Sequence, residues 1–209
     1  MSYIIVGLGN PGAEYENTRH NTGRIFLEAF RVAENLSDWE TDFKTKALIS
    51  SGKVGTSAVM LIEPETFMNK SGDAVKKCKD LKFKTTGKGK QKMVEAVNLA
   101  VIHDDLDIPF GKVKISFNKS SGGHRGVESI MKAIKTESFV RVRVGISPVT
   151  PKGDLKKPKG EEAVDKHILG KFSPDQLATL KKLSKTLNES LHTLVVDGRE
   201  MAMSQQSGL

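Results

Sequence analysis

The sequence predicts a single-domain α/β fold, in which a mixed, mostly parallel twisted sheet is flanked by helices. Short apolar runs alternate along the chain with segments of helical periodicity, which is the pattern of this fold class. The 209 residues suffice for one sizeable core. With 37% hydrophobic and 28% charged residues, the composition excludes disordered and fibrous classes. We therefore expect one domain over residues 1–209.

Three short apolar runs are typical of strands that are covered on both faces. They span residues 3–6, 59–62 and 99–102, and we expect them at the centre of the sheet. In residues 113–117 and 140–144 apolar side chains alternate with Lys114 and Ser116 and with Arg141 and Arg143. Such alternation predicts strands with one polar face. These two strands indicate a mixed rather than a purely parallel sheet.

Three segments repeat apolar residues at the i, i+3, i+4 spacing of a helix with one packed face. The first starts near Thr22, which we expect to be its N-cap, and the second follows the glycine pair 122–123. The third follows Ser173 and Pro174, an N-cap residue and a first-turn proline. The helices thus alternate with the predicted strands.

Two lysine-rich segments, near residues 83–91 and 148–160, lack an apolar pattern and are predicted to be surface loops within the single domain. The formal net charge is +8. A positive charge favours polyanionic partners, because each neutralised phosphate releases condensed counterions. It also serves solubility in many basic enzymes.

Other classes of protein are disfavoured by what the sequence contains. The single cysteine, Cys78, excludes a disulfide framework and a cysteine-based metal cluster, which favours a reducing compartment. No apolar run approaches the ~20 residues of a membrane span, and a strand predicted from residue 3 leaves no room for a signal peptide. The five histidines show no metal-ligand spacing, so we expect no metal site.

A glycine motif at residues 7–12 formally matches the dinucleotide-binding pattern G-x-G-x-x-G after a strand. That pattern requires a helix to begin within the glycines, because the helix N-terminus binds the pyrophosphate. Here Pro11 and Gly12 are followed by further turn residues, and helical periodicity starts only near Gly23. A nucleotide cofactor is therefore disfavoured, and we expect none.

Polar residues follow three predicted strands, where α/β proteins build their sites. Asn10, Asn69 and Asp104 lie in these positions, and His20 lies in the loop before the first helix. A histidine beside a carboxylate is the usual general-base arrangement. The same residues also fit ordinary turn positions, and the neighbouring Phe67 and Met68 fit ordinary packing.

The segments that carry these residues resemble the bacterial-type peptidyl-tRNA hydrolase family over almost the whole chain. The matching motifs, in chain order, are IVGLGNPG at 5–12, TRHNTG at 18–23, PETFMNKSG at 64–72, HDDLDIP at 103–109 and GGHRG at 122–126. The resemblance implies hydrolysis of the ester between a peptide and the 3′-terminal ribose of tRNA. It implies no cofactor.

The resemblance also implies roles for individual residues. His20 matches the catalytic base, Asp104 the acid that supports it, and Asn10 a residue that helps to separate blocked from unblocked aminoacyl-tRNA. Arg125 stands where the family commonly has asparagine, and an arginine near a helix start is suited to phosphate. The positions matched to contacts with the tRNA or peptide are Tyr15, Phe67, Met68 and Asn69.

The expected partner is the acceptor arm and CCA end of peptidyl-tRNA, bound by a monomer that needs no membrane or obligate protein partner. The cytoplasm is the expected location, with a mitochondrial one as the alternative. A catalytically inactive RNA-binding relative of the same fold stays open as the other reading. General RNA binding is less favoured, because aromatic residues for base stacking make up only 6% of the chain.

Overall fold

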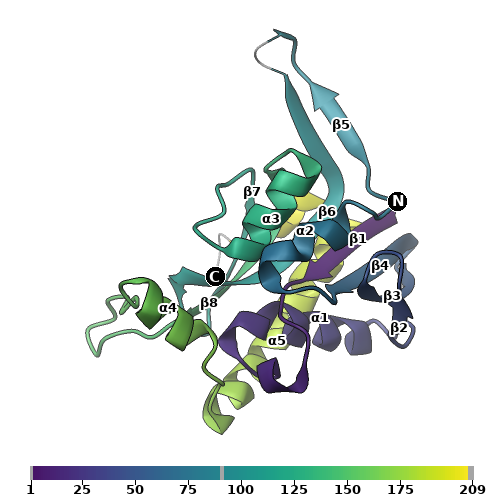
Figure 1. The fold of residues 1–209 in the computed structure, drawn as a ribbon. Helices are drawn as coiled ribbons and strands as arrows, with labels where there is room; N and C mark the ends of the chain where they lie inside the picture. The colour runs from purple at the N-terminus through teal and green to yellow at the C-terminus, as the bar shows by residue number, and fades with distance from the viewer. Residues whose placement is uncertain (1, 90–91, 207–209) are drawn as a thin grey trace.

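The computed structural model describes residues 2–89 and 92–206, and this part of the chain forms one mixed sheet flanked by helices (Figure 1). The sheet has eight strands in the order β2-β3-β4-β1-β6-β8-β7, with β5 paired to β6. The four central strands β4, β1, β6 and β8 are parallel, and antiparallel strands complete the sheet. The predicted α/β fold is confirmed. The strands are β1 (Ser2–Gly7), β2 (Glu40–Asp42), β3 (Ala47–Val54), β4 (Ser57–Pro64), β5 (Phe83–Thr86), β6 (Met93–Pro109), β7 (Val113–Phe117) and β8 (Ser138–Ser147).

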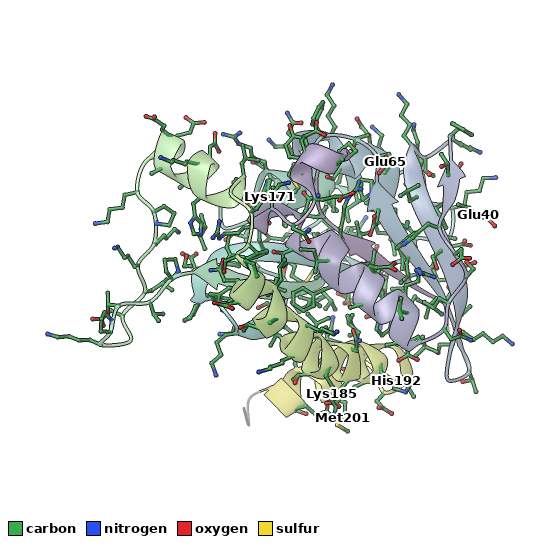
Figure 2. The ribbon with its side chains drawn as sticks, turned by 90° about the horizontal axis from the view of Figure 1, so that it is seen from below. Glu40, Glu65, Lys171, Lys185, His192 and Met201 are labelled. Carbon is green, nitrogen blue, oxygen red and sulfur yellow. The ribbon has the colours of Figure 1, made fainter. Side chains whose placement is uncertain are left out.

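The helices cover both faces of the sheet. One face carries α1 and α5, which Figure 2 shows side by side, with Lys185 and His192 along α5. The other face carries α2 and α3. No helix of the described residues is long and apolar enough to cross a membrane. The helices are α1 (Thr22–Ala33), α2 (Ser71–Val75), α3 (Arg125–Ile134), α4 (Glu161–Ile168), α5 (Pro174–Val196) and α6 (Arg199–Gln206), with 3₁₀ turns η1 (Ala13–Tyr15), η2 (Arg19–Asn21) and η3 (Met68–Lys70).

Strand β1 lies at the centre of two hydrophobic clusters. Its residues Ile4 and Val6 belong to the cluster under α2 and α3, whereas Tyr3 and Ile5 belong to the cluster under α1 and α5. Side chains of a strand point alternately to the two faces of a sheet, so apolar residues in succession satisfy both clusters. The continuous apolar pattern of β1 therefore identified a central strand correctly.

Two glycines let α1 begin close against the carboxyl ends of β1 and β6. A Cβ at Gly23 would lie 2.3 Å from the backbone nitrogen of Leu8 and 2.4 Å from the carbonyl oxygen of Ile102. A Cβ at Gly7 would lie 2.7 Å from the carbonyl oxygen of Gly23. A side chain at either position would clash, so α1 can begin this close to the sheet only because both residues are glycine. The residues between the two glycines then fold over this edge of the sheet.

The interpretation of residues 83–91 as a loop was wrong for Phe83–Thr86, which form β5. This strand pairs antiparallel with the first part of β6, from Phe83 opposite Ala96 to Thr86 opposite Met93. The pairing extends β6 to 17 residues, although only residues 99–102 were predicted as a strand. Sequence periodicity missed it because β5 is exposed along its whole length. Lys90 and Gln91 lie outside the described residues.

Residues 148–160 contain only turns, bends and bridges, in agreement with a loop.

The predicted polar face of residues 140–144 was also wrong, because Arg141 is only 1% exposed. Strand β8 lies between β6 and β7 and is covered on both faces. The Arg141 guanidinium lies 4.5 Å from the centre of the Phe139 ring and donates to the carbonyl oxygen of Glu137. Stacking and one hydrogen bond thus accompany its burial.

Helix starts were predicted with mixed success. The capping box at Ser173 is present, because its hydroxyl accepts from the Gln176 backbone and the Gln176 side chain accepts from the Ser173 backbone. Thr22 is not the N-cap of α1. It is the first helical residue after Asn21, and its hydroxyl donates to the carbonyl oxygen of Arg19.

Candidate active site

A pocket of about 690 Å³ lies where β6 ends, bordered by residues of η1, η2, η3, α3 and α4. The carboxyl ends of parallel strands meet at this edge, which is the usual place for sites in open α/β sheets. The structure brings together every residue that the sequence singled out for catalysis or binding. The pocket lining includes Asn10, Tyr15, His20, Phe67, Met68, Asn69, Asp104 and Arg125.

His20 and Asp104 form a buried hydrogen-bonded pair. The His20 Nδ1 atom lies 3.0 Å from Oδ1 and 3.2 Å from Oδ2 of Asp104. The His20 side chain is 8% exposed and that of Asp104 is 3% exposed. A carboxylate accepts hydrogen bonds, so Nδ1 of His20 carries the proton and Nε2 keeps the lone pair. The free lone pair is what a general base requires.

His124 is a second histidine on the same carboxylate, and the sequence reasoning did not select it. Its Nε2 atom lies 2.9 Å from Oδ1 of Asp104. Its Nδ1 atom accepts from the backbone N–H groups of Gly126 and Val127, so His124 is the N-cap of α3. A ring nitrogen that accepts is unprotonated, which assigns the proton to Nε2 and makes it a donor to Asp104. The sequence feature that could have identified His124 as this N-cap is its position between a glycine pair and a predicted helix.

The neighbouring histidines shift the ionisation of Asp104, and Asp104 shifts that of His20. Burial alone would raise the pKa of the Asp104 carboxyl, but the adjacent His20 and His124 outweigh burial and hold this pKa well below its ordinary value. Burial lowers the pKa of the His20 imidazole, and the charge and hydrogen bond of Asp104 raise it by more, so the net shift is upward. Burial lowers the pKa of the neighbouring His103 to about 3, which keeps that ring neutral.

The ligand atoms of His20, Asp104 and His124 lie within 4.8 Å of one another, a grouping that can hold a metal ion. The donor chemistry does not fit such an ion. A metal at this position would need the lone pair of His124 Nε2, but that atom carries the proton while Nδ1 accepts from the start of α3. The three residues are therefore accounted for as a hydrogen-bonded cluster.

Asn10 is fixed by a reciprocal pair of hydrogen bonds with Asn21. The Asn10 backbone nitrogen donates to Oδ1 of Asn21 at 2.8 Å, and Nδ2 of Asn21 donates to the Asn10 carbonyl oxygen at 2.9 Å. The Asn10 side-chain oxygen accepts from the backbone nitrogen of Met68 at 2.9 Å. Asn10 Nδ2 is then the donor left for a ligand. Asn21, which the sequence reasoning did not select, positions this group.

A buried cluster around Arg24 joins α1 to the segment that leads to Met68. One nitrogen of its guanidinium donates to Glu65 at 2.8 Å and also to the carbonyl oxygen of Pro64, while another lies 3.6 Å from Glu63. The Arg24 side chain is 14% exposed and that of Glu63 is 8% exposed. The Arg24 guanidinium is thus held by two carboxylates and one backbone carbonyl. Arg24 therefore braces one wall of the pocket.

Residues of α4 and the segment before it form the opposite wall. A guanidinium nitrogen of Arg125 lies 2.6 Å from a carboxylate oxygen of Glu161 and 3.9 Å from one of Asp165, both in α4. Lys157 lies 2.6 Å from Asp107 at the end of β6. These side chains are largely exposed, so the ion pairs contribute little free energy. Arg125, predicted to bind phosphate, thus lies across the pocket mouth against acidic groups.

We predict that Glu63→Gln stabilises the protein at pH 8 more than at pH 5. Burial raises the pKa of Glu63 from its ordinary value of 4.5 to about 7, and the charge of Arg24 only partly opposes this. The folded state therefore holds the proton more tightly, and Glu63 costs stability as pH rises from about 4.5 to about 7. The difference in unfolding free energy should grow by on the order of 3 kcal/mol across this range.

Urea unfolding of both proteins at several pH values measures this difference. Glu65→Gln is the matched control, because Glu65 contacts the same guanidinium with a more exposed side chain. If the two variants differ from the parent by the same amount at every pH, ionisation of Glu63 does not carry the effect.

Comparisons with known proteins agree with this geometry. A family model described as peptidyl-tRNA hydrolase matches residues 4–208. The peptidyl-tRNA hydrolase of Clostridium acetobutylicum is 33% identical over 207 residues, covering 99% of this chain and 98% of that protein. That of Caldanaerobacter subterraneus subsp. tengcongensis is 35% identical over 206 residues, covering 99% and 100%. A crystal structure of peptidyl-tRNA hydrolase from Acinetobacter baumannii has 28% identity and a TM-score of 0.79, covering 98% of this chain and 93% of that one. The chain therefore belongs to the peptidyl-tRNA hydrolase family.

Proposed function

We propose that the protein hydrolyses the ester bond between a peptide, or an N-blocked amino acid, and the 3′-terminal ribose of tRNA. The observation that carries this proposal is the buried Asp104 carboxylate, which orients His20 so that a lone pair remains on Nε2 at the pocket. Membership of the family and the full-length likeness to its members support the same activity.

In the proposed reaction, Nε2 of His20 takes a proton from a water molecule as its oxygen attacks the ester carbonyl carbon. The Asp104 carboxylate stabilises the imidazolium that forms. The carbon–oxygen bond to the ribose then breaks, and the proton on His20 passes to the departing 3′ oxygen. The carboxamides of Asn10 and Asn69 line the pocket and are suited to the oxyanion that develops.

Water is a better candidate for the nucleophile than a side chain. The Cys78 thiol lies outside the pocket lining, and its sulfur is 3.8 Å from the sulfur of Met60. Burial raises the pKa of this thiol, which reduces its nucleophilicity at neutral pH. An ester is activated relative to an amide, so a positioned water and a base suffice.

The pocket mouth suits the CCA end and acceptor arm of tRNA. Phe67 is 59% exposed, and an exposed aromatic ring at a site offers a stacking surface for a base or a side chain. Tyr15, Met68 and Asn69 lie in the same lining, where they would contact the terminal nucleotides or the peptide. Cationic groups at Lys70, Arg125 and Lys157 would meet phosphates.

A catalytically inactive RNA-binding relative is the weaker alternative, because its site would not need the buried pair of His20 and Asp104. We also propose that the protein acts as a monomer. The substrate arises wherever translation occurs. The cytoplasm is therefore the proposed location, with a mitochondrion as the second candidate.

We expect His20→Ala to lower kcat/KM for an N-acetylated aminoacyl-tRNA by about 10²–10⁴, the usual contribution of a general base. His192→Ala is a matched control, because His192 also contacts a carboxylate, that of Glu34, on the exposed surface of α5. Asp104→Asn should also slow the reaction strongly. It should move the acid limb of the pH profile to lower pH, because Asp104 raises the pKa of His20. A folded His20→Ala protein with near-normal activity would overturn the mechanism.

We expect Asn10→Ala to lose discrimination between blocked and free aminoacyl-tRNA. A carboxamide can pair with a neutral peptide group, but it would not replace the hydration of a charged ammonium. The ratio of kcat/KM for N-acetylated over free aminoacyl-tRNA should fall, and salt should not restore it. The same ratio in the variant and the parent across a salt series would exclude Asn10 from this role.

We expect Arg125→Ala to raise KM with little change in kcat, and Arg125→Asn to restore part of the loss. The physical reason is a guanidinium contact with a phosphate near the start of α3. Glu161→Gln should lower KM, because it frees Arg125 from its carboxylate partner. A reduced kcat with unchanged KM would instead assign Arg125 to the reacting centre.

A further inference from the structure

Strand β5, the residues directly after it and the start of β6 form a projecting basic arm, defined as residues 82–89 and 92–93 (Figure 1). These residues include four lysines and no aspartate or glutamate. The lysines that the structure describes are exposed, and no ion pair joins them to an acidic side chain of the described residues. They are Lys82, Lys84, Lys88 and Lys92.

The arm lies far from the pocket. It joins the amino end of β6, whereas Asp104 lies near the carboxyl end, and the two ends point away from each other along the strand. Met93 and Asp104 are eleven residues apart, which corresponds to roughly 35 Å in an extended strand. The arm therefore cannot contact the ester while the pocket holds it. Residues 148–160 differ, because Lys157 lines the pocket.

The charges on the arm do not stabilise it. Like charges on neighbouring residues of a two-stranded ribbon repel, and such ribbons are marginally stable alone. Phe83, the first residue of β5, is 49% exposed, and Met93, the first residue of β6, is 37% exposed. The arm therefore buries little apolar surface. Lysines do protect exposed strand edges from pairing with other chains. That role alone would not require every charge on the arm to have the same sign.

We propose that the basic arm binds the phosphate backbone of structured RNA at a surface separate from the pocket. A protruding strip of unpaired lysines matches a polyanion, and release of condensed counterions drives such contacts. Few aromatic groups are present for stacking, which favours backbone contact over recognition of bases. The RNA is either the body of the substrate tRNA, which rests on the proposed function, or a second RNA.

A triple variant, Lys84→Gln with Lys88→Gln and Lys92→Gln, tests the proposal. Lys152→Gln with Lys156→Gln and Lys159→Gln is the matched control, because it removes the same charge from the other basic segment and spares Lys157. Each protein is assayed with N-acetylated aminoacyl-tRNA and with an N-acetylated aminoacyl minihelix of the acceptor stem, over about 50–200 mM salt. Binding to deacylated tRNA and to a ribosomal RNA fragment is measured alongside.

If the arm contacts the tRNA body, the arm variant should show a salt slope lower by about 2–3 with full-length tRNA, since each phosphate contact contributes about one. The loss of affinity of the arm variant relative to the parent should then shrink by at least about tenfold between 50 and 200 mM salt. Hydrolysis of the minihelix and kcat should stay unchanged. Weakened binding of the ribosomal fragment with an unchanged KM for tRNA would support the second RNA as the source.

A charge-reversed arm, with glutamate at the same three positions, separates RNA binding from edge protection. Glutamate also blocks strand pairing, so a merely protective role predicts soluble protein with normal RNA affinity. RNA binding predicts a larger loss than with glutamine. Unchanged affinity for every RNA in both variants would overturn the proposal. Failure of the parent to hydrolyse either substrate would instead overturn the proposed function.

Discussion

The buried carboxylate of Asp104 is the interaction on which the site depends. A charge removed from water must be hydrogen-bonded, and here His20 and His124 supply the donors from two different elements. By accepting both N–H groups, Asp104 also sets which nitrogen of each ring carries the proton. The close packing at Gly23 is a precondition, because it brings η2 and the end of β6 together. Close backbone packing thus helps to place the carboxylate that sets the tautomer of the proposed base.

Much of the fold followed from the sequence where one physical cause acted alone. Strands buried on both faces must be apolar throughout, so residues 3–6, 59–62 and 99–102 were recognised. Strand β5 was not predicted, because it is ordered by hydrogen bonds to β6 and such bonds leave no periodic apolar pattern in the sequence. The polar face predicted for Arg141 was wrong because alternation does not report what covers a strand, and this guanidinium is buried against the ring of Phe139 in the same strand.

The site was predicted in part for a similar reason. Residues such as Asn10, His20 and Asp104 follow predicted strands or precede a helix, so topology alone brings them to one edge. The role of His124 depends on a capping geometry and a hydrogen bond across 20 residues, neither of which spacing encodes. The contact between Arg24 and Glu63 was not predicted, because a buried ion pair leaves no pattern in the sequence.

The two walls of the pocket are held by forces of different strength. On one side, Asn10 and Met68 are joined by buried hydrogen bonds, and Arg24 braces the same segment from within the protein. On the other side, α4 has no fully buried residue and meets the pocket through exposed ion pairs such as Arg125 with Glu161. Exposed ion pairs are weak and screened by salt, so local opening of α4 costs far less than displacement of the opposite wall.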